Sequence, residues 1–295
     1  MTEEDRAATI RSVERWFEHQ GLPYFVPSNA ERVHAALSRS RLIPVLAVAL
    51  ALGVAAGLFS GLGSSDVSSG IVVGALVLGL VVLAYGLFSL HLKPIIRWAT
   101  GQTFGSLGSL FPLVTRALPL LLLFITFLFI NTEVWQVCSA LDRGLLWLTV
   151  MLFAAIAVVF LLVRLPEEVR QVSAEAEGDR LVKICARTPV EDAAHELTND
   201  AAHADLTRLQ QANLVLVLLF SQALQVLLLS LSVFAFFLVF GKVAITDTVI
   251  KAWVGTAPEP LPSLDWLPIS NQLFQVAVFL AAFSGLYFTV YAVTD

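Results

Sequence analysis

The sequence predicts an all-α membrane protein with six transmembrane helices and both termini in the cytoplasm, and three observations support this class. The chain of 295 residues is 57% hydrophobic and only 14% charged, whereas soluble domains are about 45–50% apolar and about 25% charged. Six segments approach the roughly 20 apolar residues that are needed to cross ~30 Å of hydrocarbon. Lysine and arginine are concentrated in alternate connecting segments, which is the usual sign of orientation in a membrane.

The six predicted spans lack charged residues and histidine at their centres. Ionisable side chains inside a membrane are expensive and generally functional, so their absence argues against a proton relay or a voltage sensor. The predicted spans are Leu42–Leu62, Ile71–Leu90, Pro112–Ile130, Leu145–Val163, Leu214–Phe240 and Leu273–Val293.

Basic residues predict the orientation of these spans. Fifteen lysines and arginines lie in the N-terminal segment, around the loop after the second span, and between the fourth and fifth spans. The opposite side has three, namely Arg143, Lys242 and Lys251. We expect the protein in the plasma membrane. Because positive residues favour the cytoplasmic side, its N-terminus and C-terminus are both expected in the cytoplasm.

This orientation divides the chain into four parts: N-terminal cytoplasmic helices (1–41), spans one to four (42–163), a cytoplasmic helical segment (164–211), and spans five and six (212–293) with an extracellular loop over 241–271. The N-terminal segment carries an apolar stripe at helical spacing that includes Trp16 and Phe17. Such amphipathic helices lie in the membrane interface or pack on the protein's own cytoplasmic loops, and the sequence leaves both interpretations open.

A long helix is predicted to begin at Pro189. Thr188 can cap it, Pro189 suits the first helical position, and no glycine or proline follows until Gly241. One continuous helix of about 50 residues would therefore extend the fifth span into the cytoplasm. The apolar stripe between Val190 and Ala204 would need a cover, supplied by the N-terminal helices, by the residues after span four, or by another subunit.

Glycines mark the first two spans. Gly53, Gly57 and Gly61 recur every four residues in the first span, and Gly70 and Gly74 open the second. Small residues at this spacing let helix backbones approach closely. The pattern favours tight packing of the first hairpin, with a dimerisation face as the alternative.

A small set of polar residues forms the candidate membrane site: Asn131 and Glu133 at the outer end of span three, and Gln222 and Gln225 in span five. Buried amides in a bilayer need hydrogen-bond partners, so they face protein or water. They either join helices or line a path for a solute. Trp135, Trp253 and Trp266 are expected in the aromatic belt at the outer interface.

Signatures of catalysis and of cofactors are missing from the sequence, which contains no Gly-x-Ser-x-Gly, His-Glu-x-x-His or Cys-x-x-Cys pattern. We therefore expect no enzyme, no cofactor and no metal site. The net charge of −5 gives no reason to expect a nucleic-acid partner. Cys138 and Cys185 are predicted on opposite sides of the membrane, so no disulfide is expected between them.

Several short stretches carry a resemblance to a group of proteins. They are TRALP at 115–119, NTEVWQ at 131–136 and RLPEEV at 164–169 within Pro112–Arg170, AFSGLYF at 282–288, and ERWF at 14–17 with GLP at 21–23. On these stretches the chain resembles uncharacterised multi-pass integral membrane proteins of actinobacteria, and the resemblance extends over about half of the chain. The resemblance implies a membrane location and no particular activity.

Two functional hypotheses follow, and a third has little support. The favoured hypothesis is a non-enzymatic scaffold or signalling component whose partners are the lipid bilayer and either a second copy or another protein, bound through the cytoplasmic helix. The alternative is a channel or secondary transporter with the polar residues of spans three and five near its path. An enzyme would need converging polar side chains, which the sequence does not supply.

Overall fold

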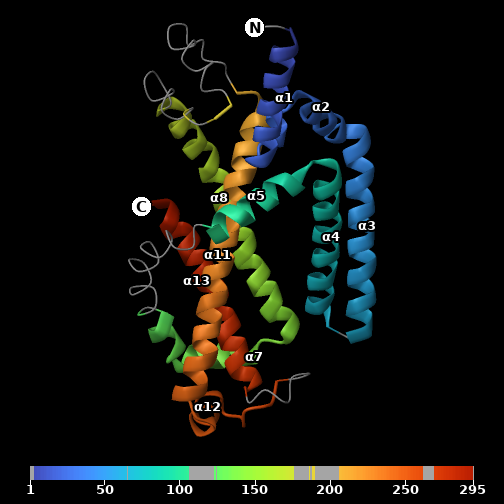
Figure 1. Cartoon of the computed structure of the whole chain (residues 1–295). Coiled ribbons are helices and arrows are strands. Elements are labelled where there is room, and N and C mark those ends of the chain that lie inside the picture. Colours follow the sequence, from blue (N-terminus) through green and yellow to red (C-terminus); the bar gives the residue numbers. More distant parts are fainter. Residues whose placement is uncertain are drawn as a thin grey trace. The chain divides into compact units, whose positions relative to one another are not determined.

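The computed structural model describes residues 3–64, 66–105, 123, 125–175, 186, 188–189, 206–261 and 269–294. Within these residues every regular element is a helix (Figure 1), apart from an isolated bridge between Pro260 and Ser270. Five of the helices are long and apolar enough to cross a membrane. They are α3 (Arg39–Ser64), α4 (Val67–Ser89), α8 (Arg143–Glu175), α11 (Arg208–Ala244) and α13 (Asn271–Thr294).

Five of the six predicted spans therefore correspond to helices of spanning length and apolarity. The third predicted span, Pro112–Ile130, falls mostly on residues 106–122 and 124, which lie outside the described residues. The chain separates into two compact units. The first contains Met1–Leu46, Val82–Phe104 and Leu161–Ser221, and the second contains Ala47–Val81, Gly105–Phe160 and Gln222–Asp295.

Helices α3 and α4 form an antiparallel hairpin (Figure 1), and the backbones of the two helices come into close contact at their glycines. The glycines of α3 face those of α4, so that a Cβ atom added at Gly57 would lie 2.8 Å from the Gly70 carbonyl oxygen, and one added at Gly53 would lie 2.9 Å from that of Gly74. A Cβ atom added at Gly61 would lie 3.7 Å from the Gly70 Cα atom. The two backbones approach as closely as they do because these positions carry no side chain.

In the first unit, helix α1 (Glu3–His19) ends where Gly21 adopts a φ of 73°, a conformation that glycine enters without steric cost. The short helix η1 (Pro23–Phe25) and helix α2 (Pro27–Ala36) follow, and α5 (Leu92–Gly105) completes the unit's shorter helices. The unit's core contains Tyr24, Val33, Leu92, Ile95 and Val217.

One buried asparagine ties the N-terminal segment to α11. Asn213 is fully buried, accepts a hydrogen bond from the Tyr24 backbone N–H at 2.8 Å, and donates to the Gly21 carbonyl oxygen at 2.9 Å. The Tyr24 hydroxyl donates to the carbonyl of Leu90 at 2.6 Å, and burial raises the pKa of this phenol to about 12. These contacts favour the interpretation in which the N-terminal residues around η1 pack on the protein itself.

The second unit contains the short helices α7 (Thr132–Ala140) and α12 (Asp247–Val254), which pack with α13 around an apolar core. Trp135 is fully buried in this core, and its indole N–H donates to the Phe129 carbonyl at 2.6 Å. The prediction that Trp135 belongs to an interfacial belt is therefore wrong, because its polar atom is satisfied inside the protein. Trp253 packs edge-to-face against it, with 5.5 Å between ring centroids.

The predicted continuous helix from Pro189 into span five is also wrong. Helix α11 begins at Arg208, and Leu206 and Thr207 are not helical. The Thr207 backbone N–H donates to Gln210 Oε1 at 2.9 Å, and the Gln210 N–H donates to Thr207 Oγ1 at 3.4 Å. This reciprocal pair is a capping box, which starts a new helix and interrupts an extension. The apolar stripe between Val190 and Ala204 lies outside the described residues.

Replacement of Thr207 by alanine tests this capping box. We expect the first turn of α11 to lose about 1 kcal/mol of stability, because the side-chain oxygen that caps the turn is removed. Amide hydrogen exchange over residues 208–211 measures the effect. Thr246→Ala serves as the control, since Thr246 occupies the same cap position of α12 without a side-chain hydrogen bond. Equal loss in both helices would contradict the assignment.

Candidate functional site

A polar pocket of about 500 Å³ lies in the second unit, where α7 ends and where α8 and α13 begin. Its residues come from segments that are far apart in the sequence. The polar ones are Ser139, Asp142, Arg143, Asn271 and Gln275. Trp147, Phe274 and Leu261 contribute apolar surface, so the pocket combines a few directional groups with apolar walls, as small-molecule sites do.

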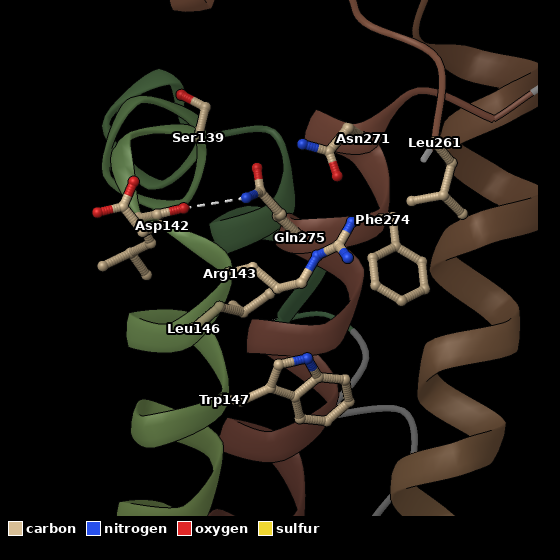
Figure 2. Close-up of a pocket in the computed structure, with 10 residues that line it drawn as sticks. Ser139, Asp142, Arg143, Leu146, Trp147, Leu261, Asn271, Phe274 and Gln275 are labelled. Atoms are coloured by element: carbon tan, nitrogen blue, oxygen red, sulfur yellow. Dashed lines mark hydrogen bonds between the residues drawn. The ribbon is translucent and has the colours of Figure 1, made fainter. Parts of the chain in front are cut away.

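Figure 2 shows the Arg143 guanidinium pointing toward Asn271 and Phe274, with Trp147 one helical turn farther along α8. The Asp142 carboxylate points away from the guanidinium. Asp142 and Arg143 both line the pocket, and the Arg143 guanidinium is the charged group on the side of Asn271 and Phe274. Because α8 and α13 both start here, their first N–H groups add partial positive charge to that of the guanidinium.

Hydrogen bonds hold the pocket's amide wall in position. Gln275, only 7% exposed, donates from Nε2 to the Leu141 carbonyl at 3.0 Å (Figure 2). One turn earlier, Gln272 Oε1 accepts from the Glu259 backbone N–H at 3.1 Å, and the Asn271 N–H donates to the Glu259 carbonyl at 2.8 Å. The start of α13 is thereby attached to α7 and to the segment after α12, which keeps the pocket's shape.

The pocket's chemistry is suited to recognition. Arginine binds a carboxylate or a phosphate through two parallel hydrogen bonds, each to a charged group contributing about 1.5–3 kcal/mol. The Ser139 hydroxyl donates to the Gln136 carbonyl at 3.1 Å, so its proton is already engaged by backbone. No histidine or cysteine lines the pocket among the described residues, and no group of three metal-binding side chains occurs in that part of the chain.

Cys138 is the described thiol nearest to this region in sequence, and it is fully buried. Burial raises its pKa from the ordinary value of 9.0 to about 12. The thiolate is the reactive form of cysteine, so the buried thiol is unreactive near neutral pH. Cys185, the second cysteine, lies outside the described residues.

The raised pKa of Cys138 leads to a dependence of stability on pH. The folded state holds the thiol proton more tightly than the unfolded state, so this contribution is complete below about pH 9 and is lost as the pH rises toward 12. We expect the unfolding midpoint to fall in alkaline solution, and to fall less in Cys138→Ala. In a Cys185→Ser background, maleimide should label Cys138 only after unfolding. Rapid labelling of the folded protein at neutral pH would contradict its burial.

The four residues of the predicted membrane site do not form one site. Asn131 caps α7, accepting hydrogen bonds from the backbone N–H groups of Glu133 at 2.7 Å and of Val134 at 3.4 Å. The Glu133 side chain is exposed. No hydrogen bond among the described residues links this pair to Gln222 or Gln225, which are half-buried on α11.

The described end of predicted span three packs on α11 through buried aromatic contacts. Phe129 stacks on Phe237 with 4.7 Å between ring centroids, and lies 5.7 Å from the Phe240 ring by the same measure. Ile125, Phe129 and Phe237 are fully buried. Gln225 precedes Phe237 by twelve residues, or about 18 Å along a helix, so it lies far from the level of Asn131 and Glu133.

Sequence reasoning missed the pocket because its residues become neighbours only in the folded chain. Arg143 contributed to the sequence prediction only as one of three outer basic residues. A weak signal was present in Asn271, Gln272 and Gln275, three amides within one and a half turns at the start of an apolar span. Such amides require partners in a membrane, and two of them find backbone partners here. No family model, curated protein or solved structure matches the chain.

Proposed function

We propose that the chain is a non-enzymatic signalling or scaffold component of the plasma membrane that binds a small organic anion at its outer face. The observation that carries the proposal is the pocket around Arg143, in which a guanidinium and two amides are placed for recognition. Trp147 and Phe274 offer apolar surface for the carbon skeleton of such an anion. A carboxylate-bearing solute fits these groups best, since arginine pairs with carboxylates bidentately.

The membrane topology in this proposal has six spans with both termini in the cytoplasm. Five helices of the described chain have the length and apolarity of spans, and the apolar stretch Pro112–Ile130 supplies the sixth. The fifteen-to-three asymmetry of basic residues supports this orientation. Arg143 and the start of α13 then lie at the extracellular end of their spans.

The alternative, a channel or secondary transporter, has less support. Its predicted path ran between spans three and five, where the described contacts are those of Ile125 and Phe129 with the buried aromatic side chains of α11. A conducting path needs polar groups or water along its length. This packing weighs against a path at that level of α11.

Ligand binding is tested by the thermal stability of the purified protein in a panel of small carboxylates, with uncharged analogues of the same size alongside. We expect at least one carboxylate to raise the unfolding midpoint, because a ligand that binds only the folded state stabilises it. Arg143→Gln should abolish the shift. Lys251→Gln removes an exposed charge of α12 outside the pocket and should retain it. No shift with any carboxylate would refute ligand binding in this pocket.

Topology and transport are tested separately. A membrane-impermeant maleimide applied to intact cells should label a single cysteine introduced at Ala257 but not one at Ser28 or at the C-terminus, in a background without the native cysteines. Labelling of the C-terminal position would indicate five spans. In proteoliposomes we expect ion and carboxylate flux equal to that of protein-free vesicles, and a flux above that level would replace the scaffold proposal by the transport alternative.

A further inference from the structure

We propose that a basic pocket in the first unit binds the phosphate group of an anionic phospholipid. The pocket encloses about 670 Å³. The pocket is lined by residues of the second half of α2, the first turns of α3, and the end of α4 with the turn that connects it to α5 (these helices are labelled in Figure 1). The proposal requires only that α3 and α4 cross a membrane, and it is independent of the ligand proposed for the pocket around Arg143.

Positive charge dominates the pocket's lining. The guanidinium groups of Arg32 and Arg41 supply this charge, and no aspartate or glutamate lines the pocket among the described residues. His91 also lines the pocket. Hydroxyl groups of Ser40 and Ser89 add neutral donors. Basic pockets between the ends of transmembrane helices attract lipid headgroups through this combination of charge and directional donors.

Arg32 is held in place by the helix that carries it. Its Nε donates to the Ser28 carbonyl at 3.2 Å, and its Nη2 donates to Asn29 Oδ1 at 2.6 Å. Asn29 Nδ2 in turn donates to the Glu18 carboxylate at 2.9 Å, so this carboxylate already has a hydrogen-bond partner. These bonds use two of the five guanidinium N–H groups. An arginine fixed in this way loses less conformational freedom when it binds a phosphate.

His91 supplies a second, independent observation. It adopts a φ of 51° in the turn between α4 and α5, a left-handed conformation that residues other than glycine enter rarely. Its ring Nδ1 is buried and has no hydrogen-bond partner among the described residues. Strained backbone is retained mainly at ligand and functional sites, and a buried nitrogen without a partner is costly. A phosphate oxygen in the pocket would accept a hydrogen bond from this nitrogen.

The apolar side of the pocket identifies the ligand as a lipid. Pro44, Val45 and Phe88 line it beside the basic groups, and the Phe88 side chain is 86% exposed. Both α3 and α4 have an end at the pocket, which places it at the level of the headgroups if these helices span the bilayer. A phospholipid would place its charged headgroup against the arginines and an acyl chain along Phe88, and so would contact both the basic and the apolar side of the pocket. Inorganic phosphate would contact only the basic side.

The proposal is tested with purified protein in neutral detergent, titrated with a short-chain phosphatidylglycerol and with the matching phosphatidylcholine. We expect the anionic lipid to raise the unfolding midpoint at lower concentration. The double variant Arg32→Gln/Arg41→Gln should weaken its apparent affinity at least about tenfold, since bonds to charged groups are worth more than 1.4 kcal/mol each. Arg39→Gln is the matched control, because Arg39 is an exposed residue of the first turn of α3 outside the pocket.

A second variant separates binding from stability. His91→Gly keeps the left-handed turn and removes the ring, so the lipid-free protein should unfold at an equal or higher temperature while its lipid affinity falls. If Arg39→Gln weakened the lipid affinity as much as the double variant does, binding in a specific pocket would be refuted and a general attraction of the lipid to the basic surface would be indicated. An equal stabilisation by inorganic phosphate would overturn the lipid assignment in favour of a soluble phosphate.

Discussion

Replacing Gly70 by alanine is expected to destabilise the α3–α4 hairpin by about 1–3 kcal/mol, the usual cost of overpacking a tight contact. The added Cβ would lie 2.7 Å from the Gly57 carbonyl oxygen and 3.2 Å from the Gly61 Cα. These are backbone atoms, which cannot rotate out of the way, so the helices must separate. The midpoint of unfolding in increasing SDS, followed by circular dichroism, measures the loss.

Gly79→Ala is the matched control for this prediction. Gly79 lies on the same helix, and a Cβ added there would meet nothing within 4 Å. Alanine has the higher helix propensity, so this variant should be neutral or slightly stabilising. If the glycines served self-association instead, Gly70→Ala would change the oligomeric state in size-exclusion chromatography and leave the unfolding midpoint unchanged.

Replacing Asn213 by leucine is expected to cost about 2–6 kcal/mol. The change leaves the Tyr24 N–H and the Gly21 carbonyl buried without their partner, and each unsatisfied group costs about 1–3 kcal/mol. The N-terminal segment should then detach from α11. Protease cleavage within residues 1–37 and faster exchange of the Tyr24 amide would report the detachment.

The control for this variant is Gln211→Leu, which places the same side chain on an exposed position of α11 two residues earlier. It should leave the cleavage pattern and the Tyr24 exchange rate unchanged. A similar rate of cleavage in both variants would mean that Asn213 does not anchor the N-terminal segment.

The candidate sites illustrate how far sequence reasoning reaches. Gly53, Gly57, Gly61, Gly70 and Gly74 could be grouped from their spacing, because residues four apart share a helix face, and the structure places them between α3 and α4. The candidate membrane site rests on residue type alone and combines Asn131, Glu133, Gln222 and Gln225. The sequence does not show which parts of two helices lie at the same depth, so this set includes residues that the structure keeps apart.

The sequence by itself determined the all-helical class and the five apolar helices of spanning length, because these depend on composition and length within one continuous segment. It did not determine where α11 begins. No proline or glycine interrupts the sequence between Pro189 and Gly241, which favours one long helix, but the capping box of Thr207 and Gln210 starts a new helix at Arg208.

Tertiary structure alone decided the burial of Trp135 and the pocket around Arg143. Each of these depends on a group from a distant segment: the Trp253 ring beside Trp135, and the start of α13 beside Arg143. The physical reason is that a long apolar helix is specified locally, whereas the partners of its few polar atoms are chosen only when the helices pack.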